Sequence, residues 1–116
     1  MLFLNATRVY LATSAIDGRK SFNTLNAVIT NTLRANPLSG TLFVFYNKKR
    51  DLIKALYWDK NGFCLLAKRL EVGRFVVPKN FSTTSLELTQ CQIQALLQGI
   101  DWQKIDAPQE LRYTIT

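Results

Sequence analysis

Three apolar segments of β type, separated by short polar turns, occupy the stretch between Gly40 and Phe75. They are rich in β-branched and aromatic residues, which are enriched in strands. The second turn contains an Asn-Gly pair at Asn61, and this pair tolerates the positive φ angles that a hairpin turn requires. The pattern predicts a meander of three strands, the first of them apolar on both faces as in a central strand. The predicted strands are Thr41–Tyr46, Leu52–Trp58 and Phe63–Glu71.

Two amphipathic helices are predicted outside the meander. Apolar residues recur every three to four positions over about Gly18–Arg34, the spacing that places them on one face of a helix. Ser14 or Asp17 suits the start of this helix, because either side chain can cap free backbone N–H groups. A second, shorter helix is predicted after the Thr-Gln capping box that begins at Thr89.

Together these segments predict an α+β fold in a single domain spanning residues 1–116. Strand patterns at Thr7–Thr13 and Leu86–Leu88 add two short strands to the meander. An antiparallel β-meander packed against two helices is the architecture that buries all these apolar faces. The tail from about Lys104 onward contains Pro108 and little pattern, so we expect it to be irregular.

Positive charge is concentrated on the predicted meander. Between Lys48 and Lys79 there are nine basic and three acidic residues, an excess of six, whereas the whole chain of 116 residues has a formal net charge of +7. The rest of the chain is therefore nearly balanced. A positive field on one structural unit is typical of a surface that meets phosphate.

The residues present exclude several kinds of catalytic site. The chain has no His, so neither a Cys/His dyad nor a Ser/His/Asp triad can form within these 116 residues. Its two cysteines lack CxxC spacing, and we expect both to be reduced thiols. No glycine-rich phosphate loop is present and no spacing of acids forces a metal site. We therefore expect no enzymatic activity, no cofactor and no metal.

The sequence also predicts a cytoplasmic location. No apolar run approaches the length that a membrane-spanning helix needs. The first residues have no basic segment, and their apolar run is too short for a secretory signal. We therefore expect no contact with a membrane.

Two groups of cations are candidate contacts for anions. Lys48–Arg50 connects two predicted strands, where a hairpin projects cations beyond the sheet toward phosphates. The alternative is a solvated turn that also protects the sheet from edge pairing. Arg19 and Lys20 fall in the first turn of the predicted helix, where they oppose the helix dipole unless an anion docks there. For this pair the alternative is contact with Asp17 or with solvent.

The strands of the meander place further cations in mostly apolar rows. Alternation puts Lys54 and Trp58 on one face of their strand, and Lys68 in an apolar row of the next strand. One hypothesis is a shared sheet face on which these lysines lie beside rings, including that of Tyr46, that stack on nucleic-acid bases. The alternative is that the lysine stems pass along apolar neighbours to reach solvent, and that the rings belong to the core.

Several runs of residues resemble one family of bacterial mobile-element proteins. They are Asp17-x-Arg19-Lys20-Ser21-Phe22, Arg50-Asp51-x-Ile53-Lys54-x-Leu56-Tyr57-Trp58-Asp59, Lys68-Arg69-Leu70-Glu71-x-Gly73-Arg74-Phe75 and Gly99-Ile100-Asp101-Trp102. Over about Arg8–Trp102 the chain resembles the small accessory protein called TnpB, the second open reading frame product, of the insertion sequence 66 group. The resemblance implies a partner of a separate DDE-type transposase, and it carries over no catalytic residues.

The cations and the resemblance together predict a non-catalytic transposition accessory protein that binds DNA at the terminal repeats of its element. The predicted contacts are Arg19, Lys20, Lys48, Lys49, Arg50, Lys54, Trp58, Lys68, Arg69 and Arg74. Because such binding is mainly electrostatic, we expect the affinity to fall steeply with salt. The alternative is an adaptor whose basic surface docks on acidic patches of the transposase without contacting DNA. The sequence leaves the oligomeric state open.

Overall fold

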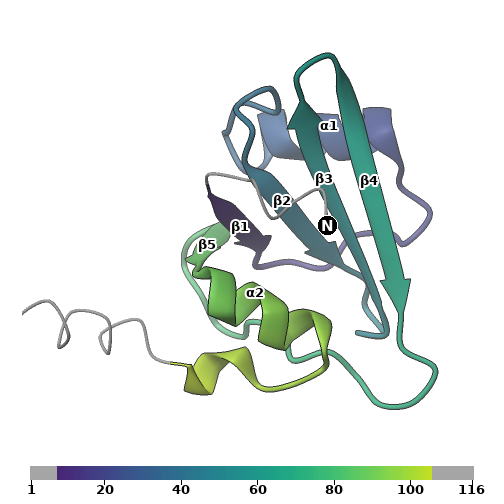
Figure 1. Cartoon of the computed structure of the whole chain (residues 1–116), viewed down its shortest axis with the longest axis vertical. Coiled ribbons are helices and arrows are strands. Elements are labelled where there is room, and N and C mark those ends of the chain that lie inside the picture. Colours follow the sequence, from purple (N-terminus) through teal and green to yellow (C-terminus); the bar gives the residue numbers. More distant parts are fainter. Residues whose placement is uncertain (1–7, 106–116) are drawn as a thin grey trace, which may run out of the picture.

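Residues 8–105 fold into a five-stranded sheet with one helix packed on each face (Figure 1). The computed structural model describes residues 8–105. All five expected strands are confirmed, and their ends differ from the expected ones by no more than two residues. In chain order the helices and strands are β1 (Val9–Ala12), α1 (Phe22–Asn31), β2 (Leu42–Tyr46), β3 (Leu52–Asp59), β4 (Gly62–Arg69), β5 (Ser85–Leu88), α2 (Gln90–Leu97) and the 3-10 helix η2 (Trp102–Lys104).

The sheet is mixed, so the expectation of a purely antiparallel sheet is wrong. Its strand order is β4-β3-β2-β1-β5. The meander of β2, β3 and β4 is antiparallel as predicted, and β5 pairs antiparallel with β1. However, β1 and β2 are parallel, with Val9 opposite Leu42. The reason is that α1 connects them, and a crossover helix returns the chain to the beginning of a neighbouring strand.

The helix α1 begins later than its sequence pattern predicted. Its first residue is Phe22 and its N-cap is Ser21, whose backbone N–H donates to Thr24 Oγ1 at 2.9 Å. Ser14 and Asp17, which were the expected caps, lie in the loop that joins β1 to α1. This loop is therefore longer than expected, and it contributes to the site described below.

Each face of the sheet buries its own apolar core. On one face Leu25 of α1 lies in a cluster with Phe43 and Phe45 of β2. On the other face Leu96 of α2 lies in a cluster with Val44 of β2. Since β2 is buried on both faces, the prediction of a central strand is confirmed. No helix within residues 8–105 is long and apolar enough to cross a membrane.

The segment after β5 packs on the α2 face of the sheet. The predicted capping box is confirmed, because Gln92 N–H donates to the hydroxyl of Thr89 at 3.1 Å. Trp102 is 4% exposed, and its indole N–H donates to Val76 O at 2.7 Å. The expected irregular tail falls mostly outside the described residues, since Lys104 ends η2 and the structure describes the chain only to residue 105.

Candidate functional site

An asparagine side chain organises the turn between β2 and β3. Asn47 Oδ1 accepts the backbone N–H groups of Asp51 and Leu52, both at 3.1 Å, and Asn47 Nδ2 donates to Asp51 Oδ1 at 2.7 Å. Arg50 in the same turn has a left-handed φ of 62°. These bonds hold the two ends of the turn together, so that the Lys48-Lys49 pair is exposed at a defined position.

We expect Asn47→Ala to lower the free energy of unfolding by about 2 kcal/mol, because three hydrogen bonds of the turn lose their side-chain partner. The matched control is Asn61→Ala in the turn between β3 and β4. The Asn61 side chain is exposed and makes no hydrogen bond to another described residue, and the left-handed φ of this turn falls on Lys60 and not on Asn61, so this change should cost less than about 0.5 kcal/mol. Urea denaturation measures both, and equal effects would contradict the role given to Asn47.

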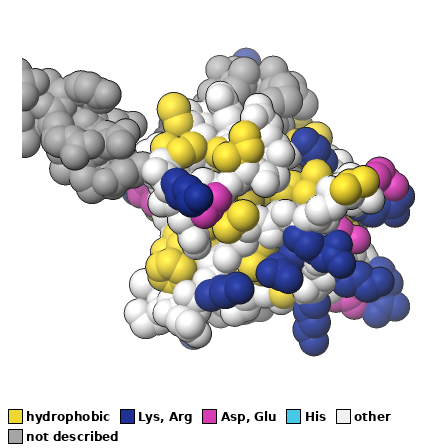
Figure 2. Space-filling model, turned by 90° about the horizontal axis from the view of Figure 1, so that it is seen from below, with side chains coloured by type: hydrophobic (Ala, Val, Ile, Leu, Met, Phe, Trp, Pro, Cys, Tyr) yellow, Lys and Arg dark blue, Asp and Glu magenta, His cyan; other side chains and the backbone are white. Residues whose placement is uncertain are grey.

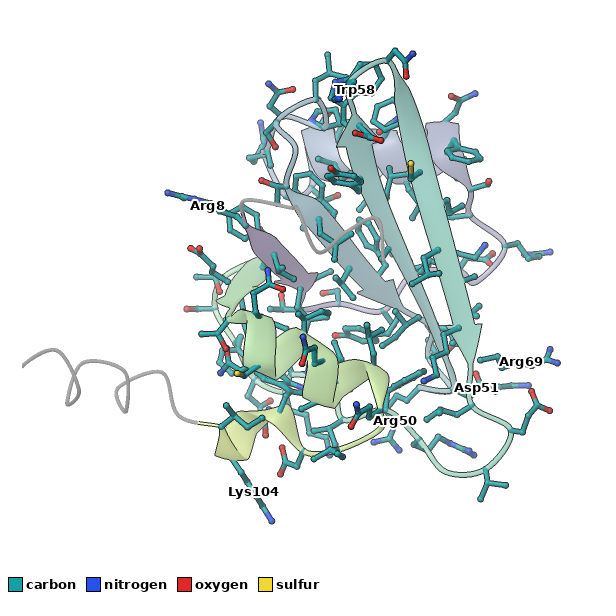
Figure 3. All side chains as sticks on the ribbon, viewed as in Figure 1. Arg8, Arg50, Asp51, Trp58, Arg69 and Lys104 are labelled. Carbon is teal, nitrogen blue, oxygen red and sulfur yellow. The ribbon has the colours of Figure 1, made fainter. Side chains whose placement is uncertain are left out.

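The segment after β4 packs against this turn. Leu70 N–H donates to Asp51 O and Phe75 N–H donates to Arg50 O, both at 2.7 Å. The Phe75 side chain is 1% exposed and lies in the core on the α2 face, so it anchors the segment. Figure 3 shows Arg50, Asp51 and Arg69 at the same lower end of the sheet.

The loop before α1 reaches the same end of the sheet, because β1 and β2 run parallel. Ile16 N–H donates to Tyr46 O at 2.9 Å, and Ile16 pairs with Asn47 in a parallel bridge. A Cβ at Gly18 would lie 3.0 Å from Leu52 Cδ2, so the loop passes directly over the beginning of β3. A surface pocket of about 450 Å³ lies between this loop and the β2–β3 turn.

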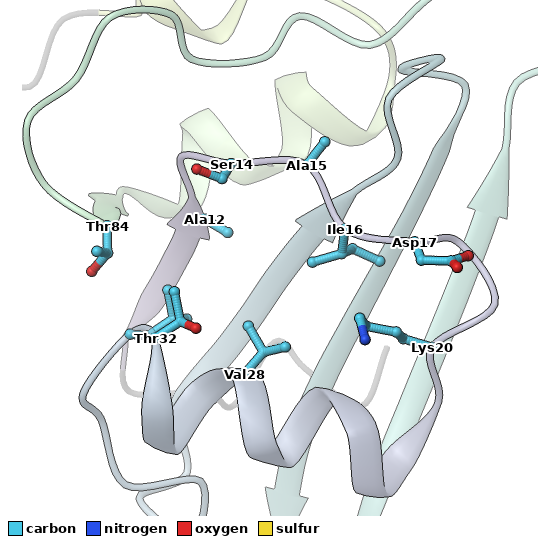
Figure 4. Close-up of a pocket in the computed structure, with 10 residues that line it drawn as sticks. Ala12, Ser14, Ala15, Ile16, Asp17, Lys20, Val28, Thr32 and Thr84 are labelled. Atoms are coloured by element: carbon cyan, nitrogen blue, oxygen red, sulfur yellow. The ribbon is translucent and has the colours of Figure 1, made fainter.

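Arg19 and Lys20 lie in this loop, so their predicted place in the first turn of α1 is wrong. Arg19 instead pairs with Asp17, which was the alternative expected from the sequence. Arg19 Nη2 lies 2.8 Å from Asp17 Oδ2, and Arg19 Nε lies 3.1 Å from Asp17 Oδ1. These bonds, together with that from the Arg19 backbone N–H, hold the pKa of the Asp17 carboxyl far below its ordinary range. The Lys20 side chain turns to the other side of the loop, toward α1 (Figure 4).

The pKa of Asp17 should depend on Arg19. The pKa of Asp17 is lower in the folded state than in the unfolded state. Its contribution to the free energy of unfolding is therefore fully present above the ordinary value of about 3.9, and it is lost as the pH falls through the folded value. We expect Arg19→Ala to raise the pKa of Asp17 toward the ordinary value, measured by NMR of the carboxyl carbon. Asp51 is the internal control, because its pKa is lowered chiefly by Asn47 and should not move. An unchanged Asp17 titration would show that Arg19 is not its partner in solution.

Three segments that are far apart in the sequence thus bring cations, most of them exposed, to one end of the sheet. Figure 2 shows Lys and Arg side chains gathered on this end, with acidic side chains among them. The pKa of Asp51 is lowered first by the hydrogen bond from Asn47, then by a hydrogen bond from its own backbone, and then by the charges of Lys49 and Arg74. Glu71 pairs with Arg69 at 3.1 Å. We call this surface the basic end and define it by its cations Arg19, Lys48, Lys49, Arg50, Arg69 and Arg74.

Lys54 and Lys68 do not share a face, so the predicted sheet face of cations and rings is wrong. Ile53 lies directly opposite Lys68 across β3 and β4, and neighbouring residues of a strand point to opposite faces. Both ammonium groups bind backbone carbonyls, since Lys54 Nζ donates to Lys20 O at 2.6 Å and Lys68 Nζ donates to Leu97 O at 2.7 Å. Leu97 ends α2, where a cation complements the helix dipole. Each lysine thus ties a segment next to a helix end to the sheet.

Neither aromatic candidate is available to stack on a base at the basic end. Trp58 is at the opposite end of the sheet from Arg50 and Arg69 (Figure 3), and its ring packs edge-to-face on Phe63 with centroids 4.9 Å apart. Tyr46 is 4% exposed and belongs to the core, which confirms the alternative that its ring is a core residue. Trp58 is therefore separated from the cations that it was expected to accompany, and Tyr46 is too buried to stack on a base.

The sequence patterns predicted the cations of the site but not the residues that hold these cations in place. The sequence prediction gave Asn47 no role, although an Asn beside a turn is a signal for hydrogen bonds to the following backbone. The contact between Ile16 and Asn47 has no local signal, because it depends on the parallel pairing of β1 and β2. Among the described residues, no group of three His, Cys, Asp or Glu side chains could hold a metal ion.

Comparisons with known proteins agree with the resemblance of the sequence motifs. The model of the family described as "IS66 Orf2 like protein" matches residues 7–107. An uncharacterized protein of Sinorhizobium fredii, y4hO, is 40% identical over 103 residues, which cover 89% of this chain and 86% of that protein. A second uncharacterized protein of that bacterium, y4jC, is 34% identical over 98 residues, covering 84% and 83%. No solved structure matches significantly. The chain therefore belongs to the IS66 Orf2-like family of transposition-associated accessory proteins.

Proposed function

We propose that this accessory protein binds DNA at the ends of its insertion sequence through the basic end, and that it catalyses no reaction itself. The observation that supports this proposal is the convergence of the six cations of the basic end from three separate segments, namely the β1–α1 loop, the β2–β3 turn, and the end of β4 with the loop that follows it. The hydrogen bonds of Asn47 and the buried Phe75 hold the second and third of these segments in place. Cations at fixed positions can follow the phosphate backbone, which supplies most of the affinity in non-specific DNA binding.

The acids of the basic end are compatible with this proposal. Asp17 and Glu71 each pair with an arginine, and both pairs are exposed to solvent. Exposed ion pairs contribute only about 0–1 kcal/mol, so exchanging a carboxylate for a phosphate costs little. The third acid, Asp51, is engaged by Asn47 and therefore does not need a cation to satisfy it. The basic end thus retains an excess of positive charge.

Fluorescence anisotropy tests the proposal directly. A labelled terminal repeat of the element, a scrambled duplex and a single strand are titrated with protein over a salt series. We expect the logarithm of the affinity to fall linearly with the logarithm of the salt concentration, with a slope of about −0.9 for each phosphate neutralised. A tighter complex with the repeat than with the scramble would add sequence recognition to this function. No binding at low salt would reject it.

The alternation of charges favours a second candidate, in which the basic end docks on an acidic surface of the transposase. Three carboxylates lie among the cations, and such mixed patterns give specificity in contacts between proteins. Co-purification with the transposase from nuclease-treated extract distinguishes the two candidates. Contact that survives the nuclease supports a protein adaptor, whereas contact that is lost indicates a DNA bridge.

A further inference from the structure

A second pocket lies across the β1–α1 loop from the basic end (Figure 4). Its volume is about 280 Å³, just below the roughly 300–1,000 Å³ of sites that hold drug-sized ligands. The pocket is therefore large enough for a single ring system. Ala15, Ile16 and Asp17 line both this pocket and the pocket beside Lys48 and Lys49, so one short loop separates the two.

Most of the wall area of this pocket is apolar, and polar side chains lie at each of its two ends. Ile16 and Val28 approach its middle from the loop and from α1 (Figure 4). Thr32 lies at one end, near Thr84, and Lys20 lies at the other end. Apolar walls with a few polar groups at the edges suit a flat ring whose rim carries hydrogen-bonding atoms.

Lys20 is the group that most clearly points to a ligand. Its side chain is directed into the pocket between the loop and α1, whereas the Asp17 carboxylate points away from the pocket, where it binds Arg19 (Figure 4). Within residues 8–105, Lys20 Nζ makes no hydrogen bond or ion pair, although the residue is half-buried. An ammonium with three donors in this position is available to an acceptor on a ligand.

We propose that this pocket holds one unpaired base of a DNA strand whose phosphates bind the basic end. The proposal rests on the proposed function, because the phosphate contacts belong to that function. The faces of the base lie between Ile16 and Val28, and two opposite edges of the base meet the ammonium of Lys20 and the hydroxyl of Thr32. Apolar side chains hold extruded bases in this way in proteins that bind unpaired nucleotides.

The test compares two labelled DNAs by anisotropy at one salt concentration: a blunt duplex, and the same duplex with one unpaired 2-aminopurine at its end. We expect the unpaired base to tighten binding about tenfold. Val28→Phe, which fills the pocket, should remove this preference, and Ala27→Phe is its control because Ala27 is exposed on the same helix. Lys20→Met is a second variant that keeps the test decisive if Val28→Phe does not fold.

The outcomes separate this inference from the function on which it rests. Loss of the preference in Val28→Phe and Lys20→Met, but not in Ala27→Phe, with a matching loss of the 2-aminopurine fluorescence change, supports the pocket. Equal binding of the two DNAs, or a preference that survives both pocket variants, overturns the inference and leaves duplex binding intact. A free deoxynucleoside monophosphate that binds while the DNAs show no preference also overturns it. No binding to either DNA rejects the proposed function as well.

Discussion

Replacing Lys48, Lys49 and Arg74 together by alanine should weaken DNA binding by about 500-fold at 0.1 M salt. The estimate takes one phosphate per cation, so that the three changes reduce the slope of affinity against salt by about 2.7 on logarithmic scales. These residues come from two different loops of the basic end, so the variant tests the surface rather than one turn. Arg50 is left unchanged because its φ of 62° makes its substitution a test of backbone strain as well.

A matched control removes the same amount of charge elsewhere. Arg8, Lys79 and Lys104 are exposed, and Figure 3 shows Arg8 and Lys104 well away from Arg50 and Arg69. We expect their triple alanine variant to keep most of the affinity and the salt slope. Anisotropy titrations at several salt concentrations measure both variants. Similar losses in the two would mean that net charge, and not the basic end, determines binding.

Phe75→Ala should lower the free energy of unfolding by about 3–5 kcal/mol, the usual cost of truncating a buried Phe. Small domains have only about 5–15 kcal/mol in total, so this variant should approach the limit of stability. The change should also disturb the basic end, because the Phe75 side chain anchors the loop that carries Arg74 and whose backbone bonds to Arg50 O. Urea denaturation measures the first effect, and DNA affinity at low temperature measures the second.

The control for Phe75→Ala lies in the same loop. Val72 is 89% exposed, so Val72→Ala should change the free energy of unfolding by less than about 0.5 kcal/mol and leave DNA affinity unchanged. A cost below about 1 kcal/mol for Phe75→Ala would show that the loop does not depend on this anchor. A large loss in Val72→Ala would indicate that the exposed tip of the loop is itself part of an interface.

Strands were predictable from the sequence because their signal is local. Runs of β-branched and aromatic residues bounded by polar turns correctly gave all five, including the short β5. The direction of β1 relative to β2 depends on a different fact, namely that α1 crosses from the end of one strand to the beginning of the other. The order strand, helix, strand is present in the sequence and is a known sign of parallel pairing, so the parallel direction of β1 and β2 could be predicted from it.

The arrangement of Lys54 and Lys68 was also within reach of the sequence. A two-residue turn at Lys60-Asn61 pairs Asp59 with Gly62, and this pairing sets the register of the whole hairpin. Counting along both strands from that turn places the two lysines on opposite faces. The alternation of side chains within each strand cannot give this result by itself. It does not show which side chains of β3 lie on the same face of the sheet as a given set of side chains of β4.

The sequence by itself determined the charge of this protein, its strands, its two helices and its family resemblance. Each of these depends on neighbouring residues or on motifs of fixed spacing, so it can be read without knowing what packs on what. Only the tertiary structure decided that Arg19, Lys49 and Arg74 lie at one end of the sheet while Trp58 lies at the other. The positions of these residues depend on the pairing of strands that are far apart in the sequence. Because β1 and β2 are parallel, the loop that follows β1 lies beside the turn that follows β2.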